Sequence, residues 1–182
     1  MRRISILSGL FLVLLFPVHP SMAADPIPDI ILNEIQIEGT SASDEFIELR
    51  NISGSVASLS GWKLQKRTSG GSVSSIKSFG DACLSLSPGD YLLWANSAGM
   101  FVPLADFVTT QSLAKTNAIE LVDGSGAVRD SLTWGDDALK GKSRKRDTET
   151  FSWETSDSPP PQGGGAFCPA PEEEEPTPDP KE

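Results

Sequence analysis

The sequence predicts an all-β protein, a β-sandwich or small barrel of about eight or nine strands. Three observations lead to this fold class. Short apolar segments alternate with polar residues at a period of two, which is typical of half-buried strands. Gly, Pro, Asn, Asp and Ser recur between these segments at short and fairly even spacing. No segment carries a convincing amphipathic helical pattern.

The first 23 residues have the features of a secretory signal peptide. Two arginines precede an apolar run from Ile4 to Val18, and a small-x-small pattern ends at Ala23. The run is short for a membrane span of about 20 residues, although a membrane anchor is the alternative interpretation. We expect cleavage after Ala23, and hence an extracytoplasmic protein in the periplasm, at the cell surface or in the medium. Residues 24–29 then form a short lead-in.

The strongest strand signal lies between Asp44 and Leu64. Alternation places Ile47 and Leu49 on one face of the first strand, and the polar side chains between and beyond them on the other. A Ser-Gly-Ser turn separates this strand from a second apolar segment that contains Trp62. Two short strands with one apolar face each are the unit of an antiparallel sheet.

The other strands are predicted from shorter apolar segments. In chain order these are Ile30–Ile37, Ile76–Phe79, Cys83–Leu86, Tyr91–Ala95, Thr109–Ala114, Asn117–Asp123 and Ala127–Trp134. Tyr91–Ala95 is apolar on both faces, so we expect it in the covered centre of a sheet. The preceding Ser-Pro-Gly-Asp predicts a tight turn with Gly89 at positive φ.

The folded domain is expected to cover residues 30–165. Residues 166–182 are predicted to form a disordered tail, because Pro and Glu dominate there and apolar residues are almost absent. Cys83 and Cys168 both follow the leader and lie 168 − 83 = 85 positions apart. An even cysteine count in an exported protein indicates a disulfide, with two free thiols as the alternative. Closing such a loop is worth roughly 4–5 kcal/mol in the chain-entropy treatment.

The sequence offers little catalytic chemistry. The single histidine, His19, lies in the leader, so the mature chain has no imidazole for a nucleophile triad or a common zinc site. Asp44-Glu45, Glu48 and Asp136-Asp137 are formally available as paired carboxylates, but adjacent acids usually form a solvated face. Asp123 and Asp136-Asp137 are candidate calcium ligands, with turn formation as the simpler interpretation. We therefore predict no catalytic residues, no metal ligands and no cofactor.

A basic segment and two tryptophans are the candidate binding residues. The cations are Lys140, Lys142, Arg144, Lys145 and Arg146, and the rings expected to be exposed are Trp134 and Trp153. Together they suggest a nucleic-acid or polysaccharide surface. The net charge of −10 disfavours nucleic acid. Pairing of the cations with nearby acids such as Asp136, Asp137, Asp147 and Glu149 is the simpler alternative.

Four segments in order resemble the lamin-tail domain. They are Asp44–Asn51, Leu59–Leu64, Leu86–Leu93 and Asn117–Asp123. The resemblance runs from about Ile30 to about Gly165 and implies an immunoglobulin-like β-sandwich that is not an enzyme. Bacterial members are typically exported and often occur beside extracellular nucleases, other hydrolases or surface modules. The two cysteines are not part of the family pattern.

These observations predict a non-catalytic exported binding or structural module. It would contact a protein or a cell-envelope component through sheet edges or through the loops Gly39–Ser43, Thr68–Ser75 and Asn96–Pro103. The alternative is a nucleic-acid- or polysaccharide-binding accessory of a separate extracellular hydrolase. A degenerate enzyme is the rival from a different class.

Overall fold

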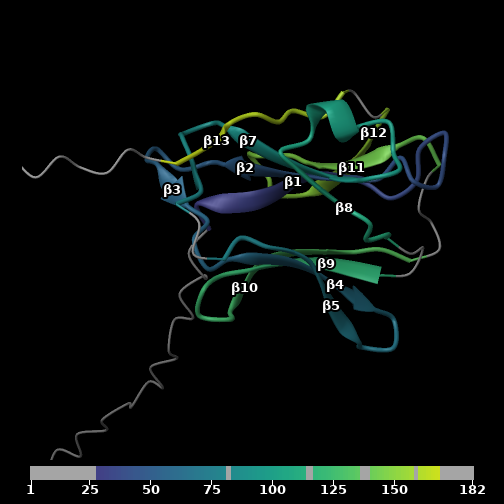
Figure 1. Cartoon of the computed structure of the whole chain (residues 1–182), viewed down its shortest axis with the longest axis horizontal. Coiled ribbons are helices and arrows are strands. Elements are labelled where there is room, and N and C mark those ends of the chain that lie inside the picture. The colour runs from purple at the N-terminus through teal and green to yellow at the C-terminus, as the bar shows by residue number, and fades with distance from the viewer. Residues whose placement is uncertain (1–27, 81–82, 114–116, 136–139, 158–159, 169–182) are drawn as a thin grey trace, which may run out of the picture.

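The protein folds as an immunoglobulin-like β-sandwich, which confirms the predicted fold class (Figure 1). This computed structural model describes residues 28–80, 83–113, 117–135, 140–157 and 160–168. Two β-sheets lie face to face, one containing β1, β2, β7, β11 and β12 and the other β4, β5, β9 and β10. The predicted signal peptide and residues 169–182 lie outside the described residues. Ala166–Phe167 were assigned to the disordered tail from the sequence but form a short strand, so the ordered chain extends beyond the predicted boundary at residue 165.

The larger sheet has six strands in the order β12-β11-β1-β2-β7-β8. These strands are β1 (Ile30–Gln36), β2 (Phe46–Asn51), β7 (Tyr91–Asn96), β8 (Phe107–Thr109), β11 (Ser143–Arg146) and β12 (Trp153–Ser156). Neighbours pair antiparallel, except that β8 runs parallel to β7. Antiparallel neighbours need only short connections, which agrees with the closely spaced turns of the sequence.

The smaller sheet has four strands in the order β10-β9-β4-β5. They are β4 (Lys63–Thr68), β5 (Val73–Ser78), β9 (Asn117–Val122) and β10 (Val128–Thr133). A third set of very short strands, β13-β6-β3, consists of β3 (Ala57–Ser58), β6 (Ser85–Leu86) and β13 (Ala166–Phe167). A single 3-10 turn, η1 (Val102–Leu104), precedes β8.

The described residues contain thirteen strands, more than the eight or nine predicted. The additional strands are short pieces such as β3 and β13, and β11, whose sequence Ser-Arg-Lys-Arg has no apolar residue to reveal it. The stretch Thr68–Ser75, predicted as a loop, instead ends β4 and begins β5, so only residues 69–72 form the turn. The serines of β5 pair with β4 through their backbones. Hydrophobic periodicity does not detect a strand of polar residues.

Alternating apolar side chains form the core between the two sheets. In β2, Ile47 and Leu49 point into it as predicted, and in β7 Leu92 and Trp94 do the same. The facing sheet contributes buried residues that include Leu64, Ile119, Leu121 and Leu132. The turn before β7 also forms as predicted, with Gly89 at φ 84°. The core therefore follows directly from the two-residue period of the strands.

The outer face of the six-stranded sheet is covered in part by the chain itself. Phe46 on this face meets Phe101 edge-to-face, with ring centroids 4.9 Å apart. Residues 160–165, here called the C-terminal strap, cross β7, and the Gly165 N–H donates to the Tyr91 carbonyl at 3.1 Å. This covering explains why Leu93 is buried even though it points away from the main core.

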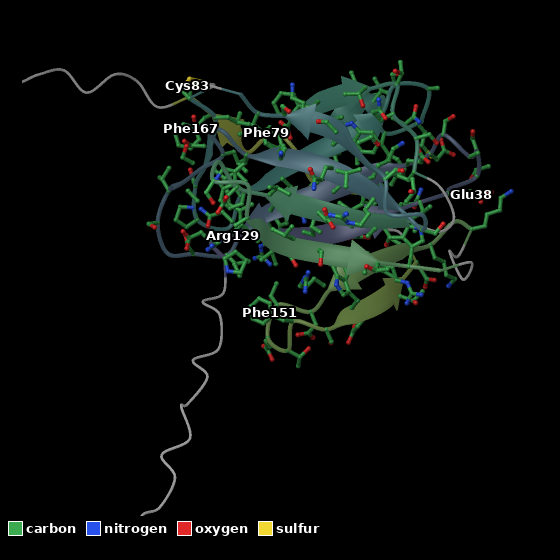
Figure 2. All side chains as sticks on the ribbon, turned by 90° about the horizontal axis from the view of Figure 1, so that it is seen from below. Glu38, Phe79, Cys83, Arg129, Phe151 and Phe167 are labelled. Atoms are coloured by element: carbon green, nitrogen blue, oxygen red, sulfur yellow. A yellow bond between two sulfur atoms is a disulfide. The ribbon has the colours of Figure 1, made fainter. Side chains whose placement is uncertain are left out.

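Cys83 and Cys168 form the predicted disulfide, with Cα atoms 4.8 Å apart. Figure 2 shows Cys83 beside Phe167 at one corner of the molecule, where β13 pairs with β6. The bond closes a loop of 85 positions and fixes the end of the C-terminal strap. A structural disulfide fits a protein of an oxidising, extracytoplasmic compartment. Within the described residues, no helix is long and apolar enough to cross a bilayer.

Candidate functional site

The five cations between Lys140 and Arg146 do not form a single basic patch. Lys140 and Lys142 pair with Glu38 (3.8 Å) and Asp157 (2.5 Å) at the sandwich surface. Lys145 pairs with Glu34 on the neighbouring strand at 3.4 Å. The Arg144 guanidinium donates to the Thr155 hydroxyl of β12 at 3.4 Å. Strand β11 sends successive side chains to opposite faces, so the charges that are adjacent in sequence are separated in space.

Arg146 is a structural residue that joins the two sheets. Its Nη2 lies 2.5 Å from Asp130 Oδ1 of β10, and its Nε donates to the Leu32 carbonyl of β1 at 3.1 Å. The guanidinium also covers the Trp153 ring, at 4.2 Å from its centroid. The Arg146 side chain is only 9% exposed. Its acceptors differ from the nearby acids considered from the sequence.

The two tryptophans do not form an exposed platform. Trp134 is only 5% exposed and belongs to the main core, so the expectation of an exposed ring is wrong for this residue. Trp153 is half-buried, packs against the core and carries Arg146 on its face. The error arose because Trp134 follows the end of a strand, where sequence alone does not reveal that the ring joins the main core.

Asp44, Glu45 and Glu48 are buried anchors rather than a solvated face. Asp44 accepts the backbone N–H of Ser41 (2.7 Å) and of Met100 (3.0 Å) through its two oxygens. Glu45 is 1% exposed and accepts the Leu113 N–H at 2.7 Å. Burial of Glu45 raises the pKa of its carboxyl. These bonds hold the loop before β2 and the segments that follow β7 and β8, so both acids position backbone.

Glu48 lies on the outer face of β2, opposite Glu34 of β1. Its side chain is 2% exposed and accepts hydrogen bonds from the Asn33 amide and from the Gln162 N–H of the C-terminal strap. Burial raises the pKa of the Glu48 carboxyl above its ordinary value of 4.5. Sequence alternation located this face correctly but did not reveal that the strap covers it.

No metal centre is evident in the part of the chain that the structure describes. No group of three or more His, Cys, Asp or Glu side chains is placed to hold an ion there. Asp123 uses one oxygen to accept the Ser125 and Ala127 N–H groups of its own turn, at 2.9 and 3.0 Å. Asp136 and Asp137 lie outside the described residues.

A polar cleft lies on the outer face of the six-stranded sheet, beside the β11–β12 turn. Its volume is about 380 Å³, and its lining includes Asn33, Arg50, Tyr91 and Lys145. Arg50 and Tyr91 are cross-strand neighbours on β2 and β7, and the guanidinium carbon lies 5.2 Å from the ring centroid. Neither residue was singled out from the sequence, because each looks like an ordinary outward-facing strand residue.

A second feature is the open edge of the four-stranded sheet. Strand β5 pairs only with β4 among the described strands, so its other side carries no strand partner. Val73, at its start, is 47% exposed. An edge strand with exposed residues presents backbone donors and acceptors to a partner.

Comparison with known proteins places the chain in a family. The Lamin Tail Domain family model matches residues 23–136, from the lead-in to just beyond β10. No curated protein matches the sequence. The match spans most of the sandwich and covers more than half of the chain. The chain therefore belongs to the Lamin Tail Domain family.

Proposed function

We propose that this protein is an exported, non-catalytic binding module that holds an extended segment of a partner protein or cell-envelope component against β5. The leader-like N-terminus and the Cys83–Cys168 disulfide support export. The family is a non-catalytic immunoglobulin-like domain that often serves binding or structural roles. The observation that carries the proposal is the exposed outer side of β5, which pairs with no other strand in the described part of the chain.

The hydrogen-bond pattern indicates which groups of β5 face outward. The Thr68 N–H donates to the Ser72 carbonyl at 2.9 Å, which marks this pair as hydrogen-bonded. In an antiparallel ladder such pairs alternate with pairs whose backbone groups point away. The alternation directs the backbone amides of Val73 and Ser75 away from β4. A partner segment adding a strand would pair with these groups.

The two sides of the sandwich differ in how they are closed. On the β10 side, Asp130 accepts the Leu32 N–H of the other sheet at 2.8 Å and pairs with Arg146. On the β5 side, Val73 of β5 is 47% exposed and Val108 of β8 is 46% exposed. Native edges are usually blocked by charge, Pro or a covering element. The first half of β5 has none of these, because its only cation, Lys77, lies near its far end, over the Phe107 ring at 4.2 Å.

The described residues do not form the basic and aromatic surface that the nucleic-acid or polysaccharide alternative requires. The five cations have separate acceptors, and Trp134 is buried. A contiguous basic surface with available rings is what such polymers need. We therefore retain the protein or cell-envelope partner as the proposal.

Affinity capture from the native cell envelope tests the edge. Ser75→Pro removes an outward amide, while Ser75→Ala removes only the hydroxyl and keeps the backbone donor. We expect capture to survive Ser75→Ala and to be lost with Ser75→Pro, with unchanged circular dichroism for both variants. Equal capture by the two variants would rule out strand addition at β5. Turnover of a nucleic-acid, glycan or peptide substrate by the wild-type protein would contradict the non-catalytic assignment.

A further inference from the structure

Arg50 carries a buried nitrogen that the fold leaves without an acceptor in the described part of the chain. This nitrogen is the Nε atom of the side chain. Its guanidinium lies over the Tyr91 ring, which supplies an attractive face but no acceptor oxygen. A buried donor without a partner costs stability, so such a group calls for a specific explanation.

The other cations of the same cleft are already paired. Lys145 lies 3.4 Å from Glu34, and Arg146 lies 2.5 Å from Asp130. Both of these acceptors are nearly buried. Among the described residues lining the cleft, Arg50 is thus the cation available to a ligand.

The loop beside Arg50 is held in a strained conformation. Phe151 has φ 56°, the one non-glycine residue with positive φ in the described chain. A bulky residue in this region is strained, and such strain is concentrated at functional sites. Asp147 stabilises the turn by accepting the Glu149 and Thr150 N–H groups at 2.8 and 2.7 Å. Figure 2 shows Phe151 in the hairpin that projects from the body of the sandwich.

This turn also lines a second hollow that Arg50 borders. The hollow measures about 430 Å³ and shares Arg50 and Thr148 with the cleft, and Phe151 lines it. Each hollow is within the range of roughly 300–1,000 Å³ that is typical of small-ligand sites. Arg50 therefore borders two spaces large enough for a side chain or a chain end.

We propose that Arg50 is the anchor of a binding site for a peptide carboxylate. A guanidinium presents a planar fork that matches a carboxylate through two parallel hydrogen bonds. The acidic residues Asp147, Glu149 and Glu154 also line this cleft. Their charges oppose a polyanion such as nucleic acid but tolerate a single carboxylate that carries a neutral or cationic neighbour. The proposal is independent of the β5 edge, which lies on the other sheet.

The test observes the Arg50 side chain directly by NMR. The ¹⁵N-labelled exported protein is titrated with acetyl-Gly-Gly-Glu-amide, with acetyl-Gly-Gly-Gly bearing a free carboxyl end, and with acetyl-Gly-Gly-Gln-amide. We expect the Arg50 Nε–H resonance to move saturably with one or both carboxylate peptides and not with the glutamine peptide. The first two probes distinguish a side-chain carboxylate from a terminal one. Inorganic phosphate is the fourth probe.

Variants then assign the site. Arg50→Gln should weaken carboxylate binding at least about tenfold, as expected for a charge-assisted bond, and Arg50→Lys should weaken it because the fork is lost. The matched control is Arg129→Gln, which changes a half-exposed arginine of the other sheet. This variant should bind the carboxylate peptides as the wild type does. A response to the glutamine peptide, unchanged binding by Arg50→Gln, or tighter binding of phosphate than of both carboxylates would overturn the proposal. The wild-type resonance decides the question even if Arg50→Gln does not fold.

Discussion

At the scale of single residues, buried carboxylates act as connectors between segments. Glu45 accepts hydrogen bonds from the Asn96 amide, the Ser112 hydroxyl and the Leu113 N–H, so one side chain fixes both ends of the segment that contains β8. Glu48 does the same for the C-terminal strap through Gln162. A carboxylate can accept several bonds, which suits it to holding irregular backbone.

The Glu48 environment predicts a specific pH dependence of stability. Burial raises the pKa of this carboxyl in the folded protein above 4.5, so the folded state binds the proton more tightly than the unfolded chain does. Its contribution to the free energy of unfolding is therefore present at low pH and is lost as pH rises through the folded pKa. Glu48→Gln should gain stability relative to the wild type as pH rises from 4.5 toward neutrality, measured by urea unfolding at several pH values.

Glu120 provides the control with the opposite sign. The Arg67 side chain, whose Nε lies 2.6 Å away, lowers the pKa of the Glu120 carboxyl below 4.5. Its contribution is present above the unfolded pKa and is lost as pH falls through the folded pKa. Below pH 4.5 the wild type therefore gains stability as pH rises and Glu120 ionises, whereas Glu120→Gln does not. The stability of Glu120→Gln relative to the wild type should fall over this pH range. The same trend in both variants would contradict these assignments.

At the scale of elements, the C-terminal strap depends on the absence of side chains. A Cβ on Gly163 would lie 2.5 Å from the Leu104 carbonyl oxygen and 3.0 Å from the Leu93 Cβ. A Cβ on Gly165 would lie 2.7 Å from the Tyr91 carbonyl oxygen. The absence of side chains at these positions lets the backbone lie directly on β7.

Replacing one strap glycine should weaken the whole C-terminal attachment. Gly163→Ala forces the strap away from rigid backbone and should cost about 1–3 kcal/mol of unfolding free energy. Gly54→Ala is the matched control, because nothing lies within 4 Å of the added methyl group. The two melting temperatures, measured by circular dichroism, decide the point. Equal values would mean that the strap does not press on β7.

At the scale of the whole molecule, the sandwich is held at one side by a polar connection across the core. Asp130 of β10 contacts both Leu32 and Arg146, which belong to β1 and β11 of the facing sheet. The opposite side is connected by aromatic contacts instead, with the Phe79 and Phe107 rings 5.8 Å apart. Because the polar connection lies on the β10 side, β5 is the accessible edge. The proposed partner segment would bind at that edge.

Removing the polar connection should destabilise the entire domain. Asp130→Ala leaves the buried Arg146 guanidinium without its carboxylate, a change that typically costs about 3–5 kcal/mol. The expected result is a clearly lower urea midpoint with the unfolding transition still cooperative. Asp157→Ala breaks the exposed pair with Lys142 and serves as the control, with no change in midpoint expected. Similar midpoints for the two variants would show that Asp130 does not join the sheets.

The two-residue period of the sequence by itself determined the all-β class and the inward face of strands such as β2, because alternation follows from strand geometry alone. It also placed the turn at Gly89 and indicated the pairing of Cys83 with Cys168, which depend on local conformation and on an even cysteine count. Only the tertiary structure decided the strand β11, the burial of Trp134 and Glu48, and the isolation of Arg50. Each of these depends on which distant segment covers or pairs with a given face, and local periodicity carries no information about that.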